Sequence, residues 1–260
     1  MKRREFLAVS AFAAAAGIGG QASGEDGAGE SKQYLELRHY EFASAEKRAG
    51  FELFLGGAAV PALNRLGIGP VGVFVGEDEK EEAGMWVLLP HRTLESVMTS
   101  NTKMLGDAEF KAAGGDVLNS AKEDPAYTRC ESCLLGAFAK CPKVEEPSKK
   151  EGRIFQLRIY ESHNEIYAKR KVEMFDEAGE IELFRETGLK PVFFGECIVG
   201  SRMPNLAYMV GFDDADSQKK AWERFVEHAE WKRMSTDPYY KDTVSNVTNI
   251  MLRPSGASQI

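Results

Sequence analysis

The sequence lacks the residue patterns that mark the commonest metal, phosphate and nucleophile sites. Its four histidines lie far apart and form no H-x-H or H-x-x-x-H pair, which leaves a metal site unsupported. It has no Gly-rich phosphate loop and no G-x-S-x-G elbow, and no pair of carboxylates stands out as catalytic. We therefore name no catalytic residue, metal or resident cofactor, and the sequence favours a binding protein over an enzyme.

Basic stretches and long apolar runs are also scarce. The formal net charge is -7, and no basic stripe of the kind that binds nucleic acid is present. The apolar run over residues 6–18 is shorter than the roughly 20 residues that a membrane-spanning helix needs. We expect neither a nucleic-acid partner nor a membrane span.

Cysteine is limited to Cys130, Cys133, Cys141 and Cys197. Structural zinc sites usually show two close cysteine pairs, and only one is present. Residues i and i+3 of a strand face opposite sides, so the first two thiols would not converge. Free thiols and a disulfide from Cys130 or Cys133 to Cys141 both stay open.

The N-terminus resembles a twin-arginine export signal. Lys2-Arg3-Arg4-Glu5-Phe6-Leu7 precedes the apolar run, and small residues follow it. We expect a signal over residues 1–22, cleaved near Ala22, and a disordered leader over 23–32. The mature protein would then be periplasmic or otherwise extracytoplasmic.

An internal repeat organises the rest of the chain. Leu37-Arg38-His39-Tyr40-Glu41 recurs as Leu157-Arg158-Ile159-Tyr160-Glu161, 120 residues later. Gly67 and Pro70 recur as Gly188 and Pro191, and Ala108-Glu109-Phe110-Lys111 recurs as Ala229-Glu230-Trp231-Lys232, both 121 residues later. Three anchors in one order indicate two domain-sized modules.

Each module has the periodicities of a β-α-β-β-α-β unit, which is the ferredoxin-like split arrangement of an α+β protein. We place module 1 at residues 33–140, a linker at 141–152 and module 2 at 153–255. In module 1, Gly56-Gly57 and Pro61 argue against a continuous first helix, and Thr93 is the expected cap of the second. Such a sheet carries helices on one face only, so the two modules are expected to pack sheet to sheet as an intrachain dimeric-type α/β barrel.

The repeated anchors resemble those of the NIPSNAP family, whose modules belong to the dimeric α/β-barrel superfamily. The resemblance covers roughly residues 33–255, and the chain as a whole is similar to exported tandem members of the family. In module 1, Phe110 stands at the position that Trp231 holds in module 2. It implies the fold and little chemistry, because the family has no agreed catalytic residues. The wider superfamily includes haem-degrading and quinone-forming monooxygenases, with pockets between sheet and helices or inside the barrel.

The repeated strands supply the candidate ligand-binding residues Arg38, Tyr40, Arg158 and Tyr160. Because side chains alternate along a strand, each arginine lies on the same face as its tyrosine. The leucines lie on the opposite face, and the face with the arginine and tyrosine is expected to line the barrel. A guanidinium fork there could bind a carboxylate or phosphate, or it could pair with a nearby carboxylate as a buried structural network. The sequence leaves both alternatives open.

Two histidines complete the candidates. His39 aligns with Ile159 on the opposite face, expected to lie against the helices, which favours a packing role. His163 follows the second repeated strand among polar neighbours and is expected to be exposed, as are His91 and His228 near helix ends.

We therefore expect an exported protein that binds a small molecule or a protein partner in the barrel or at its rim, with homodimerisation an open question. One alternative is a monooxygenase acting on haem or an aromatic compound, with His39, His163 or the tyrosines as the available haem ligands. The other is an interaction module without a ligand. The analogy behind the monooxygenase rests on fold alone.

Overall fold

The computed structural model describes residues 31–77 and 84–260. The predicted export signal and most of the predicted leader lie outside the described residues, as do residues 78–83. Within the described residues, no helix is both long enough and apolar enough to cross a membrane.

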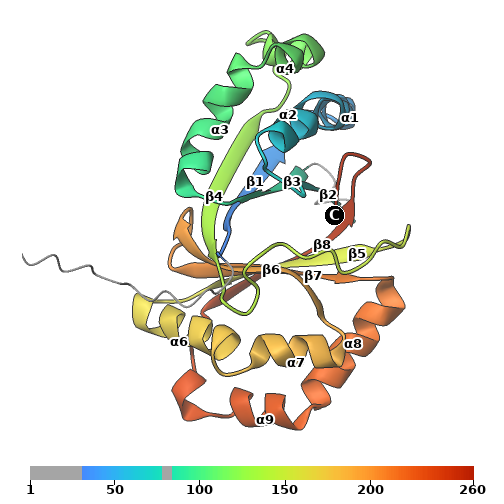
Figure 1. The fold of residues 1–260 in the computed structure, drawn as a ribbon. Helices are drawn as coiled ribbons and strands as arrows, with labels where there is room; N and C mark the ends of the chain where they lie inside the picture. Colours follow the sequence, from blue (N-terminus) through green and yellow to red (C-terminus); the bar gives the residue numbers. More distant parts are fainter. Residues whose placement is uncertain (1–30, 78–83) are drawn as a thin grey trace, which may run out of the picture. The chain divides into compact units, whose positions relative to one another are not determined.

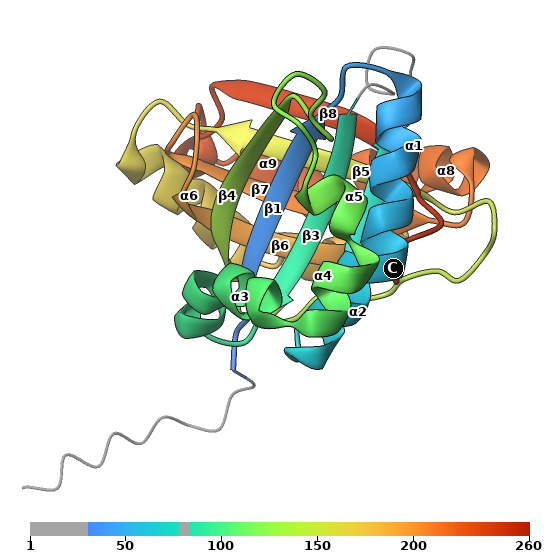
Figure 2. The same ribbon diagram turned by 90° about the horizontal axis from the view of Figure 1, so that it is seen from above.

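The described strands close into one antiparallel barrel (Figures 1 and 2). In module 1 they are β1 (Tyr34–Glu41), β2 (Gly72–Gly76), β3 (Gly84–His91) and β4 (Arg129–Ala137). In module 2 they are β5 (Ile154–Glu161), β6 (Lys190–Val199), β7 (Asn205–Phe212) and β8 (Asn246–Pro254). Their order around the barrel is β1-β3-β2-β8-β5-β7-β6-β4.

Each module contributes one four-stranded sheet, β4-β1-β3-β2 and β8-β5-β7-β6, with the repeated strand in a central position. The two sheets join edge to edge through the antiparallel pairs β2–β8 and β4–β6. Closure leaves neither sheet with an open edge. The predicted α+β fold, with two ferredoxin-like modules forming one barrel, is confirmed.

Helices cover the outer face of each sheet (Figure 1). Module 1 has α1 (Ala45–Phe54), η1 (Leu55–Ala59), α2 (Val60–Arg65), α3 (Leu94–Gly106), α4 (Ala108–Ala113) and α5 (Gly115–Leu118). Module 2 has α6 (Glu165–Asp176), α7 (Glu180–Thr187), α8 (Ala215–Glu227), α9 (Ala229–Ser235) and the 3₁₀ turn η2 (Pro238–Tyr240).

The first helix of module 1 is interrupted where the glycines occur. Gly56 and Gly57 lie in the π-helical turn η1, and Pro61 lies in the first turn of α2, where its missing N–H is tolerated. Thr93 caps α3 as predicted, its hydroxyl accepting the Ser96 backbone N–H.

Apolar side chains of both modules fill the barrel. Leu37 of β1 and Leu157 of β5 belong to one buried cluster, and Phe74 meets Phe155 with ring centres 4.9 Å apart. The alternate residues face the helices instead, as Tyr40 does against α1. The prediction that the arginine and tyrosine face lines the barrel was therefore wrong. Because the two sheets bury their inner faces against each other, the aliphatic residues of each strand lie inside the barrel. The arginines and tyrosines lie on the side that faces the helices.

Candidate functional site

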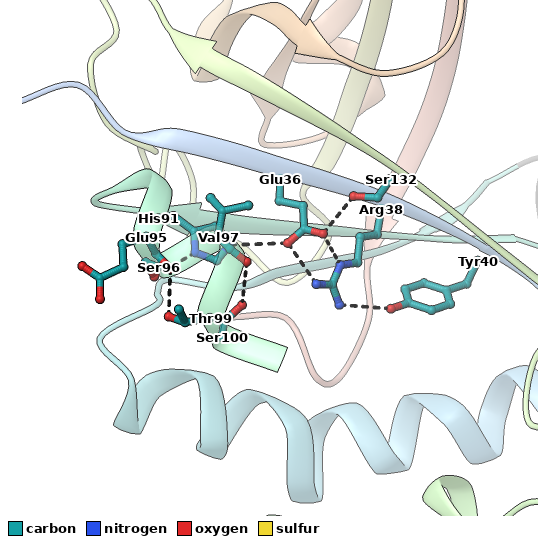
Figure 3. A network of polar contacts seen from close by, with 10 residues as sticks. All are labelled: Glu36, Arg38, Tyr40, His91, Glu95, Ser96, Val97, Thr99, Ser100 and Ser132. Carbon is teal, nitrogen blue, oxygen red and sulfur yellow. Dashed lines mark hydrogen bonds and ion pairs between the residues drawn. The ribbon is translucent and has the colours of Figure 1, made fainter. Parts of the chain in front are cut away.

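Module 1 holds Arg38 in a neutralised network on the helix-facing side of β1 (Figure 3). Arg38 donates to both carboxylate oxygens of Glu36, from Nε at 2.7 Å and from Nη2 at 2.9 Å. Ser132 on β4 donates its hydroxyl to Glu36 Oε1 at 2.8 Å, and Tyr40 Oη lies 3.4 Å from Arg38 Nη1. The charge of this guanidinium is therefore balanced inside the module.

His91 joins the network from the end of β3. Its side chain is fully buried, with Nδ1 3.0 Å from the Ser96 hydroxyl and Nε2 3.5 Å from Glu36 Oε2. The second distance is too long for a strong hydrogen bond. The expectation of a solvated His91 was wrong, because β3 runs through this residue and places its ring beneath the first turn of α3.

The network changes the acidity of its members. Burial alone would raise the pKa of Glu36, but hydrogen bonds with His91, Arg38 and Ser132 and the charge of Arg38 lower that pKa to about 2. Burial raises the pKa of the Tyr40 hydroxyl to about 12. At neutral pH this module therefore holds a carboxylate, a guanidinium and a neutral phenol.

Aromatic rings occupy the space between sheet and helices in module 1. The Tyr40 ring centre lies 4.8 Å from that of Phe51 on α1 and 5.2 Å from that of Tyr127. These are close-packed aromatic contacts. Together with the Glu36 ion pair, they favour the structural alternative for Arg38 and Tyr40.

Module 2 has the same strand positions with different partners. Gln156 stands where the repeat has Glu36, so no negative charge is present there. Its Oε1 accepts the indole N–H of Trp222 at 2.7 Å, and its Nε2 donates to Asn249 Oδ1 at 2.6 Å. Arg158 therefore lacks a carboxylate at the position where its counterpart finds one.

The guanidinium of Arg158 lies over two aromatic rings. Its Cζ is 5.1 Å from the ring centre of Tyr160 and 5.1 Å from that of Trp222. Within the part of the chain that the structure describes, its buried Nε has no hydrogen-bond partner. A buried charged donor without an acceptor is destabilising, so an oxygen atom of a ligand would complete this position.

A cavity of about 460 Å³ opens beside Arg158, between the sheet and helices of module 2. This volume falls within the roughly 300–1,000 Å³ of typical small-molecule pockets. Its residues come from β5, β7 and β8, from α6 to α9, and from the segment after α9. The aromatic part of the wall consists of Tyr160, Phe184, Tyr208, Trp222, Phe225, Trp231 and Tyr240.

Two polar pairs also line the cavity. The hydroxyls of Tyr160 and Tyr208 are 2.9 Å apart. Lys171 Nζ donates to Glu180 Oε2 at 2.7 Å, and both side chains are almost fully buried. With Arg158, these groups place two cations and one carboxylate at an otherwise apolar wall, which suits a ligand of negative charge.

Burial governs the acidity of the cavity. It raises the pKa of Tyr208 well above its usual value and also raises the pKa of Tyr160, although the charge of Arg158 opposes both shifts. It raises the pKa of Glu180 as well, with the charge and hydrogen bond of Lys171 offsetting part of the shift. The two phenols are therefore hydrogen-bond donors at neutral pH.

The structure thus separates the predicted candidates. Arg158 and Tyr160 line the cavity. His39 lies on the barrel side of β1, stacked on Trp86 with ring centres 4.4 Å apart, so its predicted helix-facing position was wrong. His163 is exposed, as predicted, with its ring 4.3 Å from that of Tyr167.

Sequence reasoning missed Tyr208, Trp222, Lys171 and Glu180. One signal was available in the repeat itself. Tyr208 stands opposite Arg158 in the β5–β7 register, at the position that Val87 occupies opposite its own arginine in module 1. A buried phenol there, together with glutamine in place of glutamate, distinguishes module 2 from module 1.

The four cysteines are free thiols. The disulfide considered between Cys141 and Cys130 or Cys133 is not formed. Burial raises the pKa of Cys133 and of Cys141 to about 12, which keeps both as thiols. Among the described residues, no group of three or more potential metal ligands comes together.

A second hollow, of about 510 Å³, lies between α1 and α5 on the surface of module 1. Acidic side chains border it, among them Glu46, Asp116 and Asp124, and Lys47 is paired with Asp124. It is slightly larger than the module 2 cavity but has none of the buried, convergent polar groups found there. The module 2 cavity is the stronger candidate site.

Comparison with known structures supports the fold. The chain is similar to a candidate monooxygenase from Fusobacterium nucleatum, with a TM-score of 0.57 and 9% identity over 86% of this chain and 93% of that one. A candidate monooxygenase from Lactobacillus acidophilus gives a TM-score of 0.56, also at 9% identity, over 86% of this chain and 94% of the other. An anthrone oxidase-like protein gives a TM-score of 0.50 at 10% identity, over 87% of this chain and 93% of the other. At such low identity these likenesses show the fold alone.

Sequence comparison adds the family. No curated protein matches this sequence. Residues 155–259 match the sequence model of the NIPSNAP family, and this region contains β5 to β8, α6 to α9 and the whole cavity lining. The match to the NIPSNAP family therefore lies in the second module of the chain.

Proposed function

We propose that module 2 binds a small, flat aromatic or polyunsaturated molecule that carries an anionic oxygen, in the cavity between its sheet and helices. The observation that carries the proposal is Arg158 at an aromatic cavity, with a buried Nε that finds no hydrogen-bond partner among the described residues. Trp222 and Trp231 provide wall area against which a flat ligand can pack. The anionic oxygen would accept from the guanidinium, for which bidentate recognition of oxyanions is well suited.

Two tryptophans at the cavity provide a direct assay. We expect 2-naphthoate to quench the fluorescence of Trp222 and Trp231, and the neutral 2-naphthamide to bind at least ~10-fold more weakly because it lacks the charge. Arg158→Met should abolish the quenching. A double variant of module 1, Glu36→Gln with Arg38→Met, removes a charge pair together and should bind normally. Equal affinity for acid and amide, or undiminished binding by the Arg158 variant, would overturn the assignment.

The haem version of the monooxygenase alternative does not fit these residues. Among residues 31–77 and 84–260, no histidine or cysteine lines the cavity. The cavity tyrosines Tyr160 and Tyr208 bond to each other, and burial raises the pKa of both, which disfavours a tyrosinate ligand. We therefore derive no step through haem. Oxidation of an aromatic compound concerns the same ligand class and stays a proposal that rests on the fold.

The cavity also supports a ligand-binding protein over an interaction module without a ligand, since its buried charged groups have no evident purpose in a purely apolar contact. Export through the twin-arginine pathway remains our proposal for location. It can be tested by fractionating cells that express the full chain and a variant in which Arg3 and Arg4 are both replaced by lysine.

A further inference from the structure

The cavity of module 2 places a carboxylate and a set of oxyanion-stabilising donors around one apolar space. Glu180 enters from α7, and Arg158 and Tyr160 enter from β5. Among the described residues, only Lys171 bonds to the Glu180 carboxylate, and it does so through Oε2 alone. The other carboxylate oxygen, Oε1, takes no part in that bond.

Two cations lie close to the ring of Tyr160. Arg158 Cζ is 5.1 Å from that ring centre, and Lys171 Nζ, which holds Glu180, is 5.7 Å from it. Tyr208 supports the Tyr160 hydroxyl from behind with its 2.9 Å contact. A carbonyl oxygen bound at Arg158 and Tyr160 would lie in the same cavity as the Glu180 carboxylate.

We propose that this cavity catalyses proton transfer at the carbon next to a carbonyl group in a flat, largely apolar ketone, with Glu180 as the base and Arg158 and Tyr160 as the oxyanion donors. The inference rests on the proposed function, because the enolate formed in the reaction is the anionic oxygen compound that the cavity is expected to bind. It names the substrate class as enolisable aryl or conjugated ketones.

The chemistry balances without a further reactant. The Glu180 carboxylate takes the proton from the α-carbon, the C–H electron pair becomes the C=C bond, and the carbonyl π pair moves to oxygen. The enolate oxygen accepts hydrogen bonds from Tyr160 and Arg158. Glu180 then returns the proton, either to the same carbon or, in a conjugated substrate, to a more distant carbon, which gives an isomer.

General principles favour this division of roles. Donors aimed at a developing oxyanion in a site shielded from water are among the strongest contributions to catalysis. A carboxylate buried against apolar walls is a stronger base than an exposed one, and burial raises the pKa of Glu180. The neutral phenol of Tyr160 can donate to the enolate throughout the physiological pH range.

The test is exchange of the α-protons of 2-tetralone for deuterium, followed by ¹H NMR in D₂O with the full-length protein. We expect exchange at least ~100-fold faster than in buffer with heat-denatured protein, and a loss of ~100-fold or more in Glu180→Gln. Tyr160→Phe should lose ~10-fold or more through one oxyanion donor. Exchange no faster than the denatured control would overturn the inference.

Glu180→Gln leaves Lys171 buried without its partner and could fail to fold, so a second variant is needed. Lys171→Met with Glu180→Gln removes both charges and should lose exchange while circular dichroism shows a folded protein. Exchange that persists in this double variant would contradict the role of Glu180. Binding without exchange in the wild type would refute the proton transfer and leave the proposed function standing, whereas absence of both would refute the two together.

Discussion

The two modules share one strand motif and use its arginine in opposite ways. In module 1, Glu36 neutralises Arg38 and aromatic rings fill the space between sheet and helices. In module 2, Gln156 stands where module 1 has the glutamate that pairs with the arginine, and a cavity of about 460 Å³ takes the place of close packing. A difference of one charged group separates a structural network from a candidate binding site. Both modules contribute a sheet to the same barrel, and the residues on the helix-facing side of each sheet differ.

The largest expected effect concerns stability. Arg38→Met leaves Glu36 buried without its main partner and should lower the free energy of unfolding by about 3–5 kcal/mol. Arg158→Met loses contacts with two aromatic rings and should cost about 1 kcal/mol. Urea unfolding of both variants measures the difference. Equal losses would mean that the two arginines do not differ in the way described.

Acid should affect the modules differently. The folded-state pKa of Glu36 is about 2, below the 4.5 of an unperturbed carboxyl, so its stabilisation is present above about pH 4.5 and is lost as the pH falls toward 2. The loss corresponds to about 3 kcal/mol in the free energy of unfolding. Unfolding curves of the wild type and Glu36→Gln between pH 5 and pH 3 should therefore converge as the pH falls.

Glu180 supplies the contrasting case. The pKa of Glu180 is raised in the folded protein, so its effect on stability has the opposite pH dependence. The free energy of unfolding should fall as the pH rises above the pKa that Glu180 has in the unfolded chain. The double variant Lys171→Met with Glu180→Gln should no longer show this fall in stability with rising pH. A parallel pH dependence for the Glu36 and Glu180 variants would contradict the opposite environments of the two glutamates.

Restoring the missing charge should convert the second module toward the first. Gln156→Glu would give Arg158 a carboxylate and should weaken 2-naphthoate binding by about 1.5–3 kcal/mol, or roughly 10- to 150-fold. Titration of the tryptophan fluorescence measures the change. The matched exchange in module 1, Glu36→Gln, should leave affinity unaltered, and a similar loss there would argue against a site confined to module 2.

The smallest effect concerns the phenol pair. Tyr208→Phe removes the partner of the Tyr160 hydroxyl and should cost about 1 kcal/mol in naphthoate affinity through poorer alignment of that donor. Tyr40→Phe is the control, since its hydroxyl lies 3.4 Å from Arg38 in module 1 and far from the cavity residues in the fold. No change with Tyr208→Phe would remove the phenol pair from the binding site.

Most of the fold could be read from the sequence because it depends on local pattern. Alternation along Tyr34–Glu41 identified a strand, and its repetition at Ile154–Glu161 identified a second module of the same topology. The residues that share a face were also predictable, since side chains alternate along a strand. The sequence did not reveal which of the two faces lies inside the barrel, because the same alternation is compatible with either side.

The candidate site was only half visible in advance. Arg158 and Tyr160 belong to the repeat, but Lys171, Glu180 and Trp222 come from helices whose apolar spacing gives no sign of a shared cavity. His91 looked solvated because the chain there is polar, whereas the strand carries it into the core. Lys171, Glu180 and Trp222 lie 13, 22 and 64 residues after Arg158, and such groups meet only when the helices pack.

The sequence by itself determined that this protein has two ferredoxin-like modules joined as a barrel, because strand periodicity and repetition are properties of local order. Only the tertiary structure decided that the arginine face meets the helices, that Glu36 neutralises one guanidinium and that its counterpart borders a cavity. These depend on the distances between side chains from separate elements, and electrostatic and packing energies follow those distances rather than sequence spacing.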